Sequence, residues 1–319
     1  SMHILVPLNS SLHLKEYMEC GAREFYIGFY DKDWEDKFGE YADINRLTGF
    51  KESANPNNFE EMIQIIETIK EQDGIVFVTF NSSSYNSEEL NFIRMYFRRL
   101  AKTNVDGVIV SCIELVDMAV QEGVTASIST ISGIYNSDIA SFYYKHGASR
   151  IILPRDLSLD EIQEIKEKVP QPEYEVFLMR NGCTFSDSNC LGLHRKDQTS
   201  FCGSYCGANQ QFVKPIHDFN MRHQMELNNI VYNQYFHAMA CGICAIYRFL
   251  KMGIAACKIV GRSDNWEHIC EDISIVYENI KIAEGCKTED EYLKRMIFPK
   301  NNREMCKLGL SCYYPEVRF

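Results

Sequence analysis

A short unit recurs along the chain, in which a helical stretch ends near a glycine and an apolar strand follows within a few residues. It occurs as ECGAREFYIG, KTNVDGVIVS, QEGVTASIST, KHGASRIILP and KMGIAACKIVG. Glycine just past a helix adopts the left-handed conformation that ends it, and the β-branched run after it is typical of a buried parallel strand. The chain therefore repeats the αβ half of a βαβ unit.

Three further apolar runs, MHILVPL, GIVFVTF and EYEVFLM, bring the number of expected strands to eight. The strands begin near residues 3, 24, 75, 107, 125, 150, 174 and 255, and amphipathic stretches separate most of them. Eight parallel strands alternating with helices predict an α/β fold of the (β/α)8 TIM-barrel type. The alternative is a doubly wound open sheet, which usually has a Gly-rich phosphate loop after its first strand, and PLNSSLH has none.

The bulk composition sets the class of protein. Of the 319 residues, 45% are hydrophobic and 24% are charged, which is typical of a folded chain with a sizeable core. We expect one barrel domain over residues 1–319, with a cysteine-rich insertion at 180–240 after the seventh strand and C-terminal helices at 264–319. The net charge of -11 argues against general attraction to nucleic acid or anionic membranes.

No run of 18 apolar residues and no secretory signal pattern is present in the sequence. We therefore expect no membrane span and a cytoplasmic location. In a reducing cytoplasm the 13 cysteines are not expected to form a disulfide framework, so clustered cysteines suggest a metal site.

In a barrel of this kind, functional residues follow the carboxyl ends of the strands. Three arginines follow consecutive predicted strands there, so together they favour an anionic ligand such as a carboxylate or phosphate, although each could also form a loop ion pair. No catalytic residue is predicted. The predicted substrate-binding residues are Asn81, Thr130, Arg155, Arg180 and Arg262.

Two long excursions leave the barrel plan. The first covers residues 28–57 and is rich in aromatic residues, so it is either a lid over the active face or a loop that packs on neighbouring helices. The second follows the seventh strand, from about residue 179 to 237, and therefore belongs to the active face.

This second excursion contains a cysteine cluster, because the 28 residues from 180 to 207 hold four of the 13 cysteines without apolar periodicity. The spacing is C-x6-C-x11-C-x3-C, whereas zinc knuckles generally use C-x2-C or C-x4-C pairs. Iron–sulfur clusters accept four thiolates at more varied spacings, so the pattern favours a cluster and leaves zinc and no metal as alternatives. The predicted ligands are Cys183, Cys190, Cys202 and Cys206.

The chain also resembles peptidase family U32, the collagenase-like proteins. The likeness includes GAREFYIG, ILPRDLSLDEI, YEVFLMRNGCTFSDSNC followed by CGSYC, and GIAACKIVGR. Relatives in this family are iron–sulfur proteins of oxygen-independent hydroxylation, acting on ubiquinone, tRNA or rRNA. The resemblance implies a barrel, and it implies that the four cysteines bind a 4Fe-4S cluster.

The chain departs from the family pattern at three places. Gly207 stands where an arginine is common, and Val260 stands where a glutamate is usual, so substrate contacts are expected to differ. Cys241 and Cys244 form a C-x2-C pair, for which we consider three roles: Cys241 as a replacement ligand of the cluster, a redox or second metal site, and a structural role.

The resemblance implies an enzyme that hydroxylates, or modifies by a related redox step, a small aromatic substrate or an RNA base. The three predicted arginines would bind an anionic cosubstrate or phosphate. A non-catalytic, cluster-bearing partner is the alternative, and a homologous protein or a second copy of the chain is then the expected partner. Proteolysis is the least favoured reading, because the sequence has no His-Glu-x-x-His or Gly-x-Ser-x-Gly motif.

Overall fold

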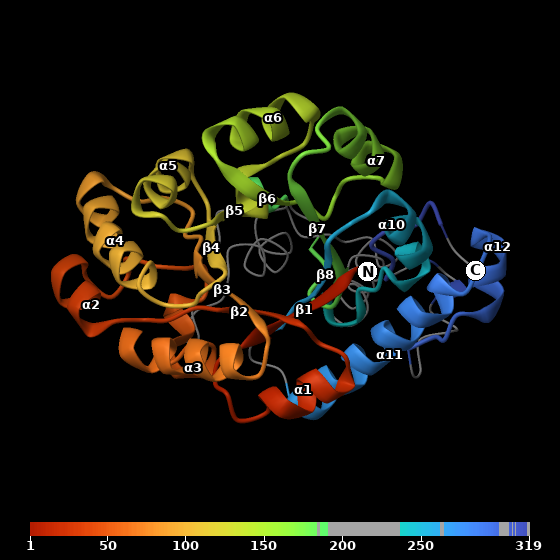
Figure 1. Cartoon of the computed structure of the whole chain (residues 1–319), viewed down its shortest axis with the longest axis horizontal. Helices are drawn as coiled ribbons and strands as arrows, with labels where there is room; N and C mark the ends of the chain where they lie inside the picture. The colour runs from red at the N-terminus through yellow and green to blue at the C-terminus, as the bar shows by residue number, and fades with distance from the viewer. Residues whose placement is uncertain are drawn as a thin grey trace, which may run out of the picture.

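A computed structural model describes residues 1–183, 186–190, 237–261, 265–299, 306–307, 309 and 311–317. In it, eight parallel strands close into a barrel in the order β1 to β8 (Figure 1). This confirms the predicted (β/α)8 fold, and each strand begins within two residues of its predicted start. The strands are β1 (His3–Leu8), β2 (Glu24–Ile27), β3 (Ile75–Phe80), β4 (Gly107–Val110), β5 (Ala126–Ile128), β6 (Ala148–Ile152), β7 (Glu173–Met179) and β8 (Ala256–Ile259).

Helices surround the barrel (Figure 1). Two of them begin at a capping box, Asn86 with Glu89 before α4 and Ser158 with Glu161 before α7, which satisfies backbone N–H groups of the first turn. None of the helices in the described ranges is long and apolar enough to cross a membrane. The helices are α1 (Leu14–Cys20), α2 (Lys32–Phe38), α3 (Phe59–Glu71), α4 (Ser87–Leu100), α5 (Ile113–Glu122), α6 (Ser137–His146), α7 (Leu159–Lys168), α10 (Ile246–Met252), α11 (Trp266–Glu284) and α12 (Glu289–Arg295).

One glycine of the recurring unit differs from its predicted role. Gly123, Gly147 and Gly253 end helices with φ angles of 75°, 116° and 73°, as the pattern predicts. Gly107 instead is the first residue of β4, well after α4 has ended at Leu100. A Cβ atom at Gly107 would lie 2.7 Å from the carbonyl oxygen of Thr125, so glycine is needed there for the close approach of the backbone that precedes β5.

The first excursion packs its main aromatic residues against a helix. Trp34 is buried, and its ring lies 4.7 Å from that of Phe38 and 5.7 Å from that of Phe92 in α4. This part of residues 28–57 therefore behaves as a packing loop. A later part, around the 3-10 helix η1 (Thr48–Ser53), lies closer to the barrel mouth, because the Asn9 side chain donates to the Ser53 carbonyl at 3.2 Å.

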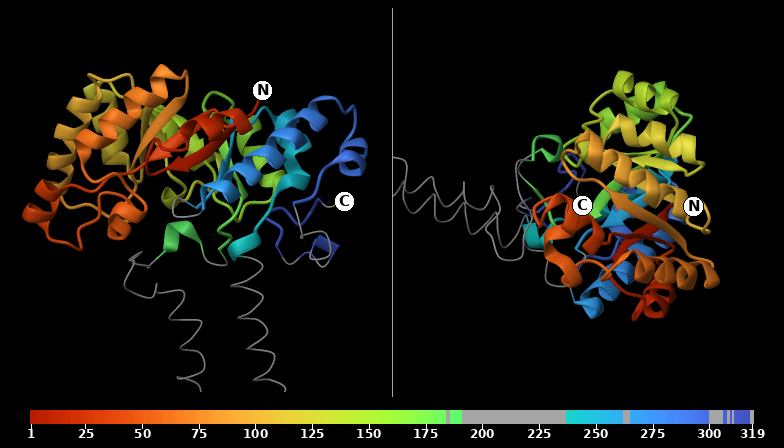
Figure 2. Two further views of the ribbon diagram at one scale, coloured as in Figure 1. Left: turned by 90° about the horizontal axis from the view of Figure 1, so that it is seen from below. Right: turned by 90° about the vertical axis from the view of Figure 1, so that its left-hand side faces the viewer.

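The second excursion leaves the barrel after β7, as predicted. Its two described ends lie together, since the backbone N–H of Arg180 donates to Ala240 at 2.7 Å and that of Gly182 donates to His237 at 3.2 Å. Figure 2 shows the green segment that carries the 3-10 helix η3 (Asp187–Asn189) and the cyan turn before η5 (Ile243–Ala245) at the same end of the barrel. The excursion therefore starts and ends at the carboxyl ends of the strands.

Candidate functional site

Four polar side chains from separate loops meet at the carboxyl end of the barrel, and we call them the rim cluster: Arg46, Thr130, Arg155 and Asp187. Asp187 in η3 is buried at its centre. Its carboxylate accepts hydrogen bonds from Arg155 at 2.9 and 3.3 Å, from Thr130 at 3.2 Å and from Arg46 at 3.4 Å. These contacts join the segment after β7 to the loops after β6, β5 and β2.

The rim cluster is held in its charged form. Burial by itself would raise the pKa of Asp187, but the positive charges of Arg155 and Arg46 outweigh burial and lower that pKa. Arg155 is fixed on two further sides, because its guanidinium lies 4.2 Å from the centre of the Phe177 ring and donates to the carbonyl oxygen of Asn181. The arrangement is therefore a preformed ion pair with little freedom to move.

The structure brings three predicted substrate-binding residues together. Thr130 and Arg155 both contact Asp187 directly. Asn81 joins them indirectly, because its side-chain oxygen accepts the backbone N–H of Arg46 at 3.1 Å. These three predicted residues therefore belong to one network. The anion at its centre is the carboxylate of Asp187, whereas the sequence predicted a bound ligand there.

Arg180 lies apart from this network. It lies against α11 and is partly exposed; its guanidinium forms an ion pair with Asp272 at 2.6 Å and donates to the carbonyl oxygen of Ala238 at 3.1 Å. Its φ angle of 70° turns the chain at the end of β7. Arg262 lies outside the described residues, so the structure places only two of the three predicted arginines.

Two predicted metal ligands flank the rim cluster. Cys183 and Cys190 are both partly buried, and they stand before and after Asp187 in the sequence. Cys183 lies within electrostatic range of Arg155, and a negative charge on its thiol helps to raise the pKa of that arginine, after the larger effect of Asp187. Cys202 and Cys206 lie outside the described residues. Within the described residues no three His, Cys, Asp or Glu side chains form a group that could hold a metal ion.

The alternative ligand, Cys241, lies at the same end of the barrel. It pairs by isolated β-bridges with Met179 at the end of β7 and with Cys312 near the end of the chain. Burial raises the pKa of its thiol, and the neighbouring thiols of Cys244, Cys306 and Cys312 raise it further. Cys241 and Cys244 thus lie in a cysteine-rich environment. Their three predicted roles, as a cluster ligand, a redox or second metal site, or a structural pair, stay predictions.

Tyr313, which was not among the predicted site residues, also contacts this end of the barrel. The Tyr313 hydroxyl donates to the carbonyl oxygen of Arg180. Burial raises the pKa of Tyr313 to about 12, and the positive charge of Arg155 opposes that rise. Tyr313 therefore stays protonated at neutral pH and ties the C-terminal segment to the start of the cysteine excursion.

A second group of charges lies inside the barrel, and we call it the interior cluster: Glu24, Arg150, Glu175 and Lys258. Paired residues of adjacent parallel strands face the same side of the sheet. Arg150 pairs with Glu173, and Lys258 pairs with Phe177, so both face the same side as Glu175, which lies two residues from each of those partners in β7. Arg150 contacts Glu24 at 2.7 Å and Glu175 at 3.4 Å. Lys258 lies 3.8 Å from Glu175 and 4.1 Å from the centre of the Tyr26 ring.

The two buried carboxyl groups of the interior cluster differ in charge preference. Burial would raise the pKa of Glu24, but the hydrogen bond from His3 and the charge of Arg150 lower it. Burial raises the pKa of Glu175 by more than Lys258 and Arg150 lower it. In addition, Glu175 Oε1 is buried and finds no hydrogen-bond partner in the structure as described. Glu175 is therefore the interior carboxyl group that accepts a proton first as the pH falls.

Some cluster residues that were not predicted as site residues can be recognised weakly from the sequence. Asp187 lies between two predicted ligands, and Lys258 interrupts a short apolar strand, where a charged residue is unusual. Glu24 and Glu175 interrupt strands in the same way. Arg46 gave no such signal, because it lies in a long loop whose path the sequence does not define.

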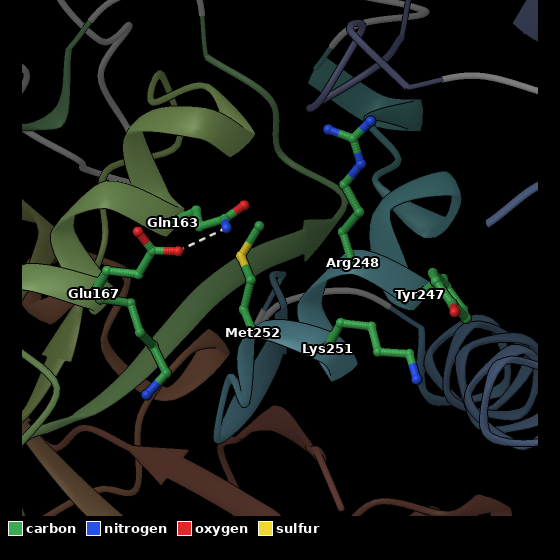
Figure 3. A pocket seen from close by; sticks show the side chains of 7 residues that line it. Gln163, Glu167, Tyr247, Arg248, Lys251 and Met252 are labelled. Atoms are coloured by element: carbon green, nitrogen blue, oxygen red, sulfur yellow. Dashed lines mark hydrogen bonds between the residues drawn. The ribbon is translucent and has the colours of Figure 1, made fainter. Parts of the chain in front are cut away.

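A pocket of about 420 Å³ between α7 and α10 does not include any predicted site residue (Figure 3). Its positive side chains have partners, since Arg248 pairs with Glu289 at 2.5 Å and Lys251 lies over the Tyr247 ring at 5.3 Å. We therefore assign the functional site to the carboxyl end of the barrel. The residues that line the pocket are Gln163, Lys166, Glu167, Tyr247, Arg248, Lys251 and Met252.

Comparison with known proteins adds the family context. The family model described as peptidase family U32 matches residues 10–316. The tRNA hydroxylation protein P1 of Bacillus subtilis is 25% identical over 282 residues, which cover 85% of this chain and 61% of that protein. An uncharacterized protease of Methanocaldococcus jannaschii is 25% identical over 316 residues, which cover 95% of this chain and 71% of that protein. The match to a solved structure of a U32 peptidase covers 82% of this chain and 94% of that chain, at 16% identity and a TM-score of 0.49.

Proposed function

Because the chain belongs to peptidase family U32, we propose that it is an iron–sulfur protein that takes part in oxygen-independent hydroxylation, or a related redox modification, of an RNA base. The observation that carries the proposal is the rim cluster, which holds the segment with Cys183 and Cys190 at the carboxyl end of the barrel. The Bacillus relative supports the reaction and the substrate class by its name, tRNA hydroxylation protein. The chain spans 61% of that relative, so the complete activity is part of the proposal.

The donor set fits a cluster better than a hard metal ion. Cys183 and Cys190 offer two thiols on one short segment, and the sequence supplies Cys202 and Cys206 in the same excursion. Thiolates are the ligands that iron–sulfur clusters use, whereas magnesium and calcium prefer oxygen ligands. These four residues would hold a 4Fe-4S cluster, with Cys241 as the alternative ligand and zinc as the alternative metal. Such a cluster supplies one-electron transfer.

The described residues have separate tasks in this proposal. Arg155 holds the ligand segment through Asp187 and Asn181. It also places a positive charge within electrostatic range of Cys183, where an anionic substrate group would approach. Asn81 fixes the backbone of Arg46 and thereby its contact with the same carboxylate. The net charge of -11 implies that RNA phosphates are contacted locally rather than along an extended surface.

The test begins with protein purified without oxygen, for which we expect about four irons per chain and a broad absorption near 400 nm. RNA from a strain that lacks the gene should lose one hydroxylated base by mass spectrometry. The wild-type gene should restore that base, and the Cys183→Ser gene should fail to restore it. Colourless protein with one zinc ion would contradict the cluster.

The same experiment separates two other functions. A cluster-bearing partner protein would contain iron but would restore the modification only together with a homologous protein. A protease, as the name of the Methanocaldococcus relative suggests, would cleave protein substrates with an unchanged RNA profile. Such cleavage, retained in the Cys183→Ser variant, would replace our proposal.

A further inference from the structure

Asp187 is linked to the backbone beside Cys183 through Arg155, and it contacts the backbone of Cys190 directly. On one side, the Arg155 guanidinium that binds the Asp187 carboxylate also donates to the carbonyl oxygen of Asn181. Cys183 lies between these two attachment points in the sequence. On the other side, the backbone carbonyl oxygen of Asp187 accepts the backbone N–H of Cys190 at 3.2 Å. Through these contacts Asp187 restrains the chain at Asn181, before Cys183, and at Cys190.

The backbone at the start of this segment needs such a restraint. Arg180 and Asn181 have φ angles of 70° and 47°, and two consecutive residues other than glycine in the left-handed region are uncommon. Such a conformation persists when the surroundings determine it, and it often occurs at functional sites. Here two contacts restrain the backbone: Arg155 donates to the carbonyl oxygen of Asn181, and Arg180 forms an ion pair with Asp272.

An exposed aspartate on the same face, linked to the ligand segment through the Tyr135 hydroxyl that also contacts Ser186, provides a contrast. Asp156, the residue after Arg155, is exposed, and its carboxylate accepts one hydrogen bond, from Tyr135 at 3.1 Å. Asp187 is 4% exposed and accepts side-chain hydrogen bonds from three loops. Burial of a carboxylate is unfavourable because the group loses its water, and the hydrogen bonds from three loops offset that loss. A residue that only made the surface polar would stay exposed, as Asp156 does.

We propose that Asp187 is the positioning residue of the ligand segment: its carboxylate, bound by Arg155, Arg46 and Thr130, fixes Cys183 and Cys190 in the arrangement that binds a cluster. This inference rests on the proposed iron–sulfur function. Residues that orient metal ligands through hydrogen bonds typically change metal affinity by about 10- to 100-fold when they are replaced. Asp187 also contributes a negative charge beside the ligands, and net charge is one determinant of cluster potential.

The variants Asp187→Asn and Asp156→Asn form a matched pair, because each removes one carboxylate charge on the same face. Both are purified without oxygen and measured for iron and sulfide, for the rate at which a chelator removes iron, and for reduction potential. We expect Asp187→Asn to lose iron at least about tenfold faster than wild type and to have a higher potential. Asp156→Asn should match wild type in both measurements.

Two further variants protect the test from a folding failure. Thr130→Val removes one donor to Asp187 and keeps the volume, so it should speed iron loss by a smaller factor, while Asp187→Glu should partly restore retention relative to Asp187→Asn. Equal iron loss and equal potential in Asp187→Asn and Asp156→Asn would overturn the positioning role. So would iron retention combined with tighter RNA binding in Asp187→Asn, which would mean that the carboxylate only occupies a substrate anion site. Wild-type protein without iron would instead remove the proposed function itself, together with this inference.

Discussion

The rim cluster and the interior cluster both place carboxylates next to arginines, but they differ in the number of cations for each carboxylate. In the interior cluster one arginine, Arg150, contacts both buried carboxyl groups, those of Glu24 and Glu175, and Lys258 lies 3.8 Å from Glu175. In the rim cluster two arginines and a threonine serve the single carboxylate of Asp187. Loss of Arg150 removes the cation that two buried carboxyl groups share, whereas loss of one of the two rim arginines leaves the other beside the single carboxylate. The interior cluster should therefore control the stability of the barrel, and the rim cluster the ligand segment.

The largest effect is expected from Arg150→Met. The change removes the cation that Glu24 and Glu175 share and leaves both carboxylates inside the barrel, which should reduce the free energy of unfolding by about 3–5 kcal/mol. Urea unfolding monitored by circular dichroism measures this loss. Arg98→Met is the control, because Arg98 is 62% exposed and loss of its surface ion pair with Glu122 should change the free energy of unfolding far less. A similar loss in both variants would contradict the comparison.

The two interior carboxyl groups should respond to pH with opposite sign. The folded pKa of Glu24 is below its ordinary value of 4.5, so its ionisation stabilises the fold above pH 4.5, and this contribution disappears as the pH falls through the folded pKa. The folded pKa of Glu175 is raised, so its contribution exists at low pH and is lost as the pH rises through that value.

We therefore expect Glu24→Gln to destabilise the protein by about 1.5–3 kcal/mol at pH 7, and by less below pH 4.5, because a charged hydrogen bond is lost. Glu175→Gln should be neutral or stabilising at pH 7, and its relative stability should fall as the pH is lowered. Unfolding in urea at several pH values between 3 and 8 checks both. Parallel pH profiles for the two variants would show that the interior carboxyl groups are equivalent.

A lysine at position 155 tests the rim cluster at an intermediate scale. Arg155→Lys keeps the positive charge but loses the fork that reaches both Asp187 and Asn181. We expect a loss of about 1–2 kcal/mol in unfolding free energy and faster release of iron from anaerobically purified protein. Hydrogen exchange of residues 180–190 is the local measurement, and unchanged exchange would mean that Arg155 does not restrain the ligand segment.

The two clusters also differ in how far the sequence predicts them. The strands follow from apolar runs and helix ends, so the barrel and the location of Asn81, Thr130 and Arg155 at one end could be predicted. The partner of Arg155 could not, because Asp187 reaches it through the path of an excursion without periodicity. Arg180 follows its strand as predicted, but its left-handed backbone directs it to α11, and the sequence alone does not indicate such a turn.

The smallest effect is expected from Arg46→Met, and it completes the comparison. Arg46 contacts Asp187 at 3.4 Å, whereas Arg155 contacts the same carboxylate at 2.9 Å and remains in the variant. The buried charge of Asp187 therefore keeps a close cation, and the loss in unfolding free energy should be at most about 1 kcal/mol, well below that of Arg150→Met. Urea unfolding of the two variants under one set of conditions measures the ratio. A loss for Arg46→Met as large as that for Arg150→Met would show that the rim carboxylate depends on both arginines, and that the second cation is not a redundant partner.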